Sequence, residues 1–258
     1  MKHYKLKVNI ENFNDKEITC LVENNLEIAR ILYSQQTQEI FFQEDNILAE
    51  TIRNYQFQFV KILRSAAKGV LCPGQVINCV LIENFNFLNE VDYNKYIRID
   101  TRNNKLEIKS YENSMTGCYR LFTDGSYAIE QGYSGYGGII ENTEGEQEVF
   151  CQSFKKGASN LMELMAVIEG LQHLSAVAKI QINTDSRFVI RGMAQWVHFW
   201  KLNNWQTAYG SQVKYTQHWK QLDRLFQNKL VELKWIKGHS GHTEQDFCHR
   251  LARKSAKI

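Results

Sequence analysis

The stretch Tyr119-Arg120-Leu121-Phe122-Thr123-Asp124-Gly125-Ser126-Tyr127 places a single carboxylate directly after an apolar run. The β-favouring residues before Asp124 predict a central strand, and Gly125 predicts a close backbone approach or a bulge. A carboxylate in such a run is partly desolvated, which is costly unless a cation or hydrogen-bond donors meet it. Asp124 therefore either opens a turn or belongs to a functional site, and the rest of the chain decides between the two.

Two more acids stand where predicted elements begin or end. Asp185 follows a short apolar strand at residues 179–182, where it could simply cap the next helix. Glu163 falls in the first turn of a helix that we expect Ser159 or Asn160 to cap and Leu174 to end, where a Glu ordinarily answers the helix dipole. Together, however, the three acids have the arrangement of a metal-dependent phosphoryl-transfer site. Hard cations prefer carboxylate oxygens, and two ions about 4 Å apart can hold the attacking and leaving oxygens.

Four segments resemble the motifs of the ribonuclease HI family in their order and spacing. They are Thr-Asp-Gly-Ser at 123–126, Asn-Leu-Met-Glu-Leu at 160–164, Thr-Asp-Ser at 184–186 and Lys-Gly-His-Ser-Gly-His at 237–242. The resemblance covers residues 118–258 and implies an α/β fold, a five-stranded mixed sheet with helices on both faces. It implies an endoribonuclease that hydrolyses the RNA strand of RNA–DNA hybrids with two Mg²⁺ ions. Asp124, Glu163 and Asp185 then match catalytic metal ligands, and His239 matches a mobile histidine that assists proton transfer and product release.

The fourth metal ligand of the family lies ten positions after the mobile histidine and is usually an aspartate, but here that position is His249. Asp246 lies three residues earlier on a predicted C-terminal helix, so either side chain can face the site. The family position favours His249. Neutral imidazole brings no negative charge, so we expect weaker Mg²⁺ binding and better tolerance of Mn²⁺. The same change leaves open another function, a hybrid-binding module of this fold with weakened catalysis.

Substrate contacts are expected from two regions near the acids. If the family chemistry applies, selectivity for a hybrid depends on contacts to 2′-hydroxyl groups of the RNA strand. We expect these contacts from the loop after Asp124, at Gly125 and Ser126, and from Ser159 and Asn160.

A third region combines tryptophans with basic residues between positions 187 and 229. Such interleaving suits a nucleic-acid surface, although a tryptophan-rich core with a solvated basic face explains part of it. In ribonuclease HI this stretch is the protruding substrate handle, which assigns substrate binding to Trp196, Trp200, Lys201 and Trp205. Phe199 and Ala158 stand where the family often has an asparagine and a threonine that bind DNA-strand phosphates. We therefore expect weaker anchoring of the DNA strand.

Length, charge and cysteine usage set the broader limits. A chain of 258 residues can hold two domains. Its net charge of +3 is too small to argue for binding of nucleic acid. Residues 1–117 carry 14 basic against 15 acidic side chains, whereas residues 118–258 carry 17 against 13, so the excess positive charge lies in the C-terminal part. Six scattered cysteines without paired spacing suggest reduced thiols in a cytoplasmic protein. We expect neither a membrane span nor a signal peptide.

Residues 1–116 predict a small α+β domain of no family that we recognise. Its expected elements are strands at 4–10 and 17–22, one helix with apolar positions from Leu48 to Ala66, and a hairpin of residues 96–101 and 105–111 around Asn103-Asn104. Asp45 or Asn46 can cap the helix and Gly69 can end it. Its apolar seam fits packing on the domain's own sheet better than a dimer contact. After a boundary at 112–117 the catalytic domain follows at 118–258. The first domain is expected to bind a protein partner, position substrate or form a homodimer, without chemistry of its own.

Overall fold

The computed structural model describes residues 3–68, 71–83, 96–130, 132–207, 210–238 and 240–257. The chain divides into two compact units. The first unit combines Met1–Asn86 with Phe199–Lys214, and the second combines Phe87–His198 with Tyr215–Ile258.

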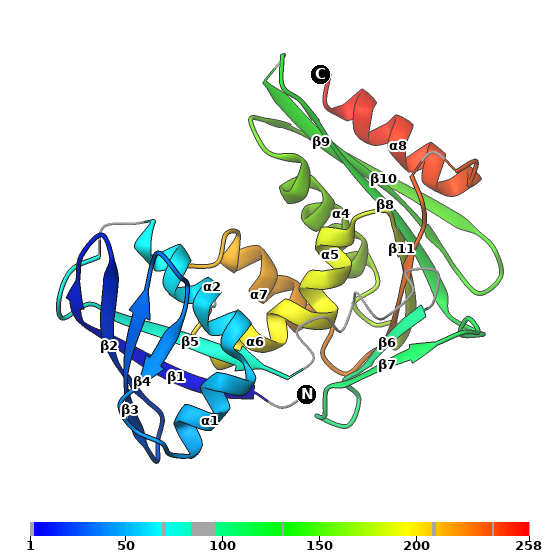
Figure 1. Cartoon of the computed structure of the whole chain (residues 1–258). Coiled ribbons are helices and arrows are strands. Elements are labelled where there is room, and N and C mark those ends of the chain that lie inside the picture. Colours follow the sequence, from blue (N-terminus) through cyan, green and yellow to red (C-terminus); the bar gives the residue numbers. More distant parts are fainter. Residues whose placement is uncertain are drawn as a thin grey trace. The chain divides into compact units, whose positions relative to one another are not determined.

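The second unit is built on a seven-stranded mixed sheet with the order β10-β9-β8-β11-β12-β6-β7 (Figure 1). Its strands are β6 (Tyr96–Asp100), β7 (Glu107–Tyr111), β8 (Tyr119–Ala128), β9 (Tyr133–Glu141), β10 (Gln147–Lys155), β11 (Lys179–Thr184) and β12 (Leu230–Trp235). Strand β11 runs parallel to both β8 and β12, and the other pairs are antiparallel. The strands from β8 to β12 form the predicted five-stranded mixed sheet.

Strands β6 and β7 form the predicted hairpin, and Asn104 in its turn has a positive φ of 56°. We expected this hairpin in the N-terminal domain, but β6 pairs antiparallel with β12 and so extends the sheet of the second unit. A polar network around Glu232 of β12, whose carboxylate is fully buried, supports this pairing. Arg98 of β6 donates to it at 2.8 Å, Gln181 of β11 at 2.7 Å, and the backbone N–H of Met115 at 3.1 Å.

Helices α4 (Ser159–His173) and α8 (Thr243–Ser255) cover opposite faces of this sheet (Figure 1). Two glycines allow the close packing. A Cβ atom on Gly125 would lie 2.4 Å from the backbone nitrogen of Glu163 in α4, and one on Gly137 would lie 2.5 Å from Cβ of Leu251 in α8. The close approach predicted at Gly125 is therefore confirmed, and it brings the end of β8 against the beginning of α4.

The start of α4 differs from the prediction. Ala158 occupies the N-cap position in extended conformation, and no side chain caps the helix. Ser159 and Asn160 are the first helical residues rather than caps, so Glu163 lies one residue beyond the first turn. An acid that interacts favourably with the helix dipole would lie in the first turn. An interaction with the dipole therefore explains the position of Glu163 less well than a role in a functional site does.

The remaining helices of the second unit follow β11 and precede β12. They are α5 (Arg187–Arg191), the π-helix η1 (Gly192–Trp196) and α7 (Thr216–Leu225), while α6 (Val197–Leu202) continues η1 along the chain into the segment assigned to the first unit. Trp219 of α7 is completely buried, and a Cβ on Gly192 would collide with its ring. Trp219 is therefore a core residue. This agrees with the alternative that part of the tryptophan-rich stretch forms a core.

The first unit contains a five-stranded antiparallel sheet with the order β4-β3-β2-β1-β5. The strands are β1 (His3–Phe13), β2 (Glu17–Glu23), β3 (Ile28–Ser34), β4 (Ile40–Phe42) and β5 (Val76–Ile82). The two strands predicted at its beginning are confirmed, and the segment Phe199–Lys214 packs on β5. Phe199 is buried with Val80 and Ile82, and the side-chain amide of Asn203 donates to the carbonyl of Asn78 at 3.4 Å.

The predicted helix is two helices, α1 (Ile47–Asn54) and α2 (Gln56–Ala67), because Tyr55 leaves the helical conformation between them. Asn46 caps α1 by accepting from the backbone N–H of Ala49 at 2.9 Å. Gly69, expected to end the helix, lies outside the described residues. The apolar positions of both helices join the core of this unit with the strands. The seam thus packs on its own sheet, as predicted.

All six cysteines are free thiols. Burial raises the pKa of the Cys20, Cys79 and Cys248 thiols to about 12, which keeps them protonated and unreactive. Within the described ranges, the helices are too short or too polar to cross a bilayer.

Candidate active site

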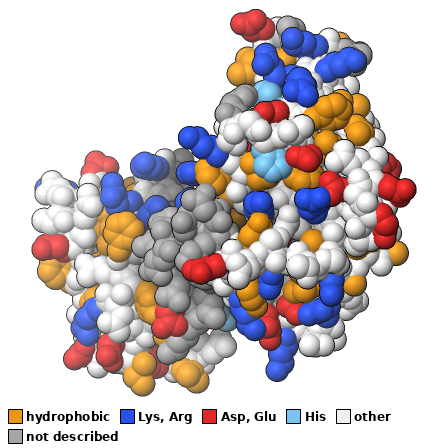
Figure 2. Space-filling model, turned by 90° about the vertical axis from the view of Figure 1, so that its right-hand side faces the viewer, with side chains coloured by type: hydrophobic (Ala, Val, Ile, Leu, Met, Phe, Trp, Pro, Cys, Tyr) orange, Lys and Arg blue, Asp and Glu red, His pale blue; other side chains and the backbone are white. Residues whose placement is uncertain are grey.

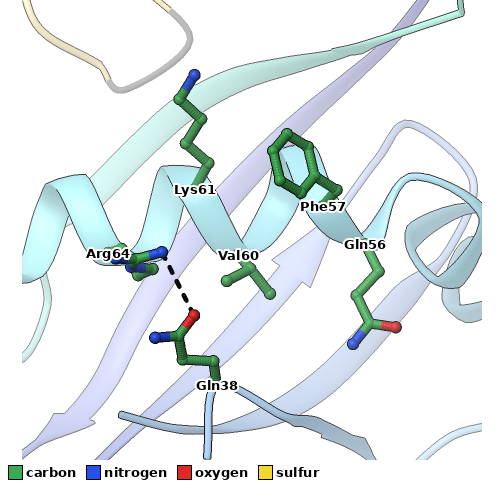
Figure 3. A pocket seen from close by; sticks show the side chains of 6 residues that line it. All are labelled: Gln38, Gln56, Phe57, Val60, Lys61 and Arg64. Carbon is green, nitrogen blue, oxygen red and sulfur yellow. Dashed lines mark hydrogen bonds between the residues drawn. The ribbon is translucent and has the colours of Figure 1, made fainter.

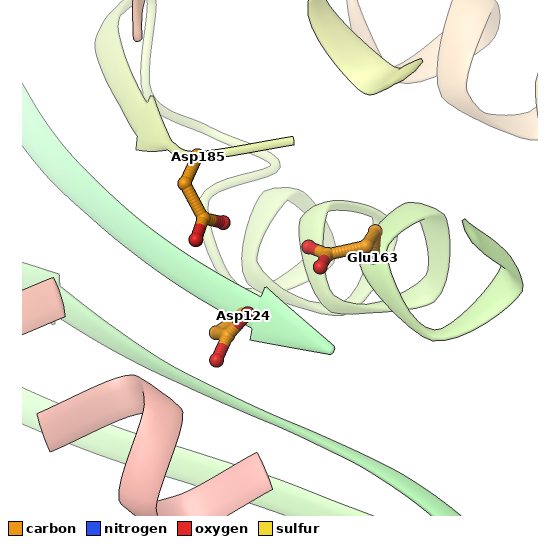
Figure 4. Close-up of side chains that lie close together, drawn as sticks. All are labelled: Asp124, Glu163 and Asp185. Atoms are coloured by element: carbon orange, nitrogen blue, oxygen red, sulfur yellow. The ribbon is translucent and has the colours of Figure 1, made fainter. Parts of the chain in front are cut away.

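Three carboxylates from three different elements meet at one end of the second unit's sheet (Figure 4). Asp124 comes from β8, Glu163 from α4, and Asp185 from the residue after β11. One oxygen of each lies within 4.8 Å of the others. Asp124 and Asp185 come together because β8 and β11 are parallel neighbours in a register that pairs Phe122 with Asn183, two residues before each acid. Gly125 brings α4 close enough to add Glu163.

Asp124 is almost completely buried. The backbone N–H of Gly125 donates to its Oδ1 at 2.9 Å, and Nδ1 of His249 lies 2.7 Å from its Oδ2. Burial raises the pKa of Asp124 above its ordinary value, while the hydrogen bond and charge of His249 act in the opposite direction. A buried carboxylate with two donors is held in a fixed orientation.

Glu163 is the least satisfied member of the cluster. It is buried, and its Oε2 has no hydrogen-bond partner among the described residues. Burial and the neighbouring charges of Asp124 and Asp185 raise the pKa of Glu163 well above its ordinary value. An unpartnered carboxylate oxygen between two other acids is the environment that a bound divalent cation would neutralise, so the residues present fit a metal site.

Asp185 is positioned by residues that the sequence did not single out. The indole N–H of Trp235 donates to the backbone carbonyl of Asp185 at 3.0 Å, and the guanidinium of Arg187 lies 4.7 Å from the centre of the Trp235 ring. A Cβ on Gly238 would lie 2.6 Å from Oδ2 of Asp185, so this position leaves space for the carboxylate. The contact between Trp235 and Asp185 results from the parallel pairing of Thr184 with Trp235, and no local sequence pattern predicts it.

Helix α8 presents His249 to the cluster. Gln245 donates from its side-chain amide to the carbonyl of Thr123 at 3.1 Å, and Cys248 is completely buried against β8, which fixes the face that carries His249. Asp246 lies with His249, Arg250 and Arg253 around a shallow hollow of about 340 Å³. Neither Asp246 nor His249 belongs to the group of three mutually close carboxylates.

Exposed basic side chains lie in the C-terminal half of α8. Figure 2 shows Lys and Arg side chains gathered at the top of the face that it presents, and α8 contributes the exposed Arg250, Arg253 and Lys254. Arg250 and Arg253 share a hollow with His249, which contacts Asp124, so positive charge that can attract a polyanion lies on the same helix as this residue.

The residues predicted to bind substrate fall into two groups. Gly125 and Ser126 lie directly after Asp124 on β8, and Ser159 and Asn160 are exposed in the turn of α4 that precedes Glu163. These four lie close in sequence to the three carboxylates. Trp196 is half-buried in η1 of the second unit, whereas Trp200, Lys201 and Trp205 belong to the first unit. His239 lies outside the described residues.

The position of Phe199 explains one departure from the family pattern. Its ring is 6% exposed and packs against Val80 and Ile82 of β5. The sequence suggested only the loss of a phosphate contact. In the structure this side chain is a core residue of the first unit, a role that requires a long-range contact and leaves no local signal.

Sequence comparisons find relatives of the part of the chain that carries these carboxylates. A family profile described as RNase H matches residues 117–257. The ribonuclease H of Sodalis glossinidius is 40% identical over 136 residues, which cover 53% of this chain and 83% of the relative. That of Enterobacter sp. strain 638 is 39% identical over 142 residues, covering 55% and 91%.

Among solved structures, LC9-RNase H1, described as a type 1 RNase H with the type 2 active-site motif, is 24% identical with a TM-score of 0.49, covering 56% of this chain and 74% of that one. LC11-RNase H1 in complex with an RNA/DNA hybrid is 14% identical with a TM-score of 0.41, covering 53% and 98%. The match of the family profile to more than half of the residues, with relatives at about 40% identity, shows that the chain belongs to the ribonuclease H family.

Proposed function

We propose that this protein is a ribonuclease H that hydrolyses the RNA strand of RNA–DNA hybrids, with two Mg²⁺ ions held by Asp124, Glu163 and Asp185. The observation that supports this function most strongly is the cluster of three carboxylates within 4.8 Å, two of them buried, in a chain of this family. Holding two buried acids and a half-buried one together without a cation is costly, so their proximity needs a functional reason.

The residues of the chain contribute position and charge rather than covalent chemistry. Divalent ions, when bound, supply Lewis-acid polarisation of the phosphoryl group and lower the pKa of the attacking water. Asp124 and Glu163 are held by Gly125, whose missing side chain lets β8 and α4 touch. Asp185 is held by Trp235. Fixed ligands keep the reacting groups in line, which reduces the entropic part of the barrier.

We assign the fourth position at the metal site to His249 rather than Asp246. The distance of 2.7 Å between Nδ1 of His249 and Oδ2 of Asp124 supports this choice, because it brings the imidazole to the edge of the carboxylate cluster. In the absence of bound metal the ring acts as a partner that orients Asp124. A site with three formal negative charges instead of four favours Mn²⁺ over Mg²⁺ more than a four-carboxylate site does. His239 would assist proton transfer, as it does in the family pattern.

Substrate selectivity would come from the residues around the first two acids. Ser126, Ser159 and Asn160 offer hydroxyl and amide groups close in sequence to Asp124 and Glu163. Such groups can bind a 2′-hydroxyl, which distinguishes RNA from DNA. Trp196, Trp200, Lys201 and Trp205 would bind the rest of the duplex.

The test uses an RNA–DNA hybrid labelled on the RNA strand and incubated with Mg²⁺ or Mn²⁺. Wild-type protein should cut the RNA internally, and Asp124→Asn or Glu163→Gln should lose at least about 100-fold in rate. Glu169→Gln on the same helix is the matched control, because Glu169 lies outside the cluster, and it should retain wild-type activity. Full activity in Asp124→Asn would overturn the proposal. Binding of the hybrid without turnover under either metal would favour the weakened binding module instead.

A further inference from the structure

Helix α2 of the first unit carries an outer face that combines basic side chains with an exposed aromatic ring. Phe57, Lys61, Arg64 and Lys68 recur at helical spacing and are all exposed, with Phe57 at 78%. At 100° per residue they fall within one side of the helix, along about 16 Å of its length. The face thus presents three cations and one aromatic ring to solvent.

Two shallow hollows lie along this face. The first, of about 460 Å³, is lined by Gln38, Gln56, Phe57, Val60, Lys61 and Arg64 (Figure 3). The second, of about 290 Å³, shares Lys61 and Arg64 and adds Ser65 and Lys68. Figure 3 shows Arg64 hydrogen-bonded to the side-chain oxygen of Gln38, at 3.3 Å, which holds the guanidinium at the edge of the first hollow.

The sequence that includes α2 carries basic residues but no acidic ones. Residues 51–82 include no acidic residue, while Arg53, Lys61, Arg64 and Lys68 are basic. The near-neutral total charge of the first 117 residues hides this local separation. A concentrated positive face with an exposed ring is complementary to a polyanion that also carries flat apolar groups.

We propose that the outer face of α2 binds an unpaired nucleic acid strand, with Arg64 and Lys68 at its phosphates and Phe57 stacked on a base. A ring that is 78% exposed is accessible for stacking, and an unpaired strand offers base faces that the interior of a duplex does not. The amides of Gln38 and Gln56 line the same hollow and can hydrogen-bond to base edges. The choice of nucleic acid over an acidic protein rests on the proposed function, since the same chain carries a ribonuclease H site.

The experiment measures binding of a fluorescein-labelled single-stranded DNA of 15 nucleotides to the full-length protein, in EDTA and over a series of salt concentrations. Arg64→Gln/Lys68→Gln should weaken binding roughly tenfold at low salt and reduce the slope of log Kd against log salt by about 1.4, since each phosphate contact on a single strand contributes about 0.7. Phe57→Ala should weaken binding at least about fivefold without changing that slope, because stacking is uncharged.

Lys5→Gln/Lys16→Gln is the matched control, because it removes two exposed cations from β1 and the β1–β2 turn of the same unit. It should bind like wild type. If it weakens binding as much as Arg64→Gln/Lys68→Gln, or if that variant lowers affinity for polyglutamate but not for DNA, the inference is wrong.

Cleavage of a blunt hybrid in Mg²⁺ is measured separately for each variant. Arg64→Gln/Lys68→Gln should cut it at the wild-type rate, so a failure of catalysis in wild-type protein is distinguishable from a failure of the α2 surface. A loss of blunt-hybrid cleavage in this variant with unchanged single-strand binding would contradict the inference.

Discussion

We expect Glu163 to destabilise the protein in the absence of a divalent cation, by an amount that depends on pH. Burial and two neighbouring acids raise the pKa of Glu163 in the folded state. The stability that its protonated form contributes is fully present below the unfolded value of about 4.3 and is lost as the pH rises through the raised folded value. In EDTA, Glu163→Gln should therefore exceed wild type in free energy of unfolding by on the order of 1 kcal/mol at pH 8.

The difference between Glu163→Gln and wild type should disappear near pH 4, where both side chains are neutral. Denaturant titrations at several pH values measure it, with Glu169→Gln as the control on the same helix. A difference that stays constant from pH 8 to pH 4 would show that packing, not charge, separates the two proteins.

His249 offers a second prediction for a single residue. Its Nδ1 lies 2.7 Å from Oδ2 of Asp124, so replacing it with aspartate adds a fourth negative charge beside the carboxylate cluster. His249→Asp should lower the Mg²⁺ concentration for half-maximal cleavage several-fold, because a hard cation prefers carboxylate oxygen. The selectivity for hybrid should not change. If His249→Asp and His249→Ala leave the metal dependence unaltered while Asp246→Asn abolishes activity, the fourth ligand is Asp246.

The sequence predicted the acids of the site but not the residues that hold them. Asp124, Glu163 and Asp185 each follow a local pattern, an apolar run or a helix start, and the structure brings them together. Trp235, Gly238 and Gln245 act through contacts between elements far apart in the chain. Such contacts depend on strand register and helix rotation, which local patterns do not specify.

At the scale of elements, the hairpin β6–β7 depends on the buried carboxylate of Glu232. Glu232→Ala should lower the free energy of unfolding of the second unit by about 3–5 kcal/mol, because it leaves Arg98 and Gln181 without their shared acceptor. Glu107→Ala on β7 is the control, since its pair with Lys109 is exposed and should cost less than about 1 kcal/mol. Equal effects of the two variants in urea titrations would contradict this role of Glu232.

The segment Phe199–Lys214 gives another prediction for an element. Phe199→Asn restores the residue common in the family but removes a buried ring from Val80 and Ile82. It should destabilise the first unit by roughly 3 kcal/mol, whereas Phe199→Leu should cost about half as much. Thermal unfolding measures both. A gain in hybrid affinity without loss of stability would mean that residue 199 contacts substrate and not the core.

Periodicity identified most elements, and its errors have physical causes. A single apolar seam from Leu48 to Ala66 predicted one helix. Tyr55 leaves the helical conformation and divides it into two helices, while buried apolar residues recur in both. Strands β3, β4, β5 and β12 were not predicted from their own residues. The hairpin β6–β7 was assigned to the wrong sheet because its alternating pattern does not specify a partner strand, whereas the contact of Arg98 with Glu232 of β12 is a long-range one.

For the whole molecule, a ribonuclease H unit that begins at residue 118 should be less stable than one that begins at residue 96. The shorter chain lacks β6 and β7 and leaves Glu232 buried without Arg98. The longer chain should show the higher unfolding midpoint. Both lack β5, which covers Phe199, so both should be less soluble than the full chain. Equal midpoints for the two truncated chains would show that the hairpin adds nothing to the unit.

The most direct test of the central claim compares three duplexes of one sequence, RNA–DNA, RNA–RNA and DNA–DNA, incubated with the full-length protein and Mg²⁺ or Mn²⁺. The close cluster of Asp124, Glu163 and Asp185 in a chain of the ribonuclease H family predicts internal cleavage of the RNA strand in the hybrid alone. Glu163→Gln should abolish that cleavage and Glu169→Gln should preserve it. Equal cutting of the hybrid and the DNA duplex, or an active Glu163→Gln protein, would contradict the account.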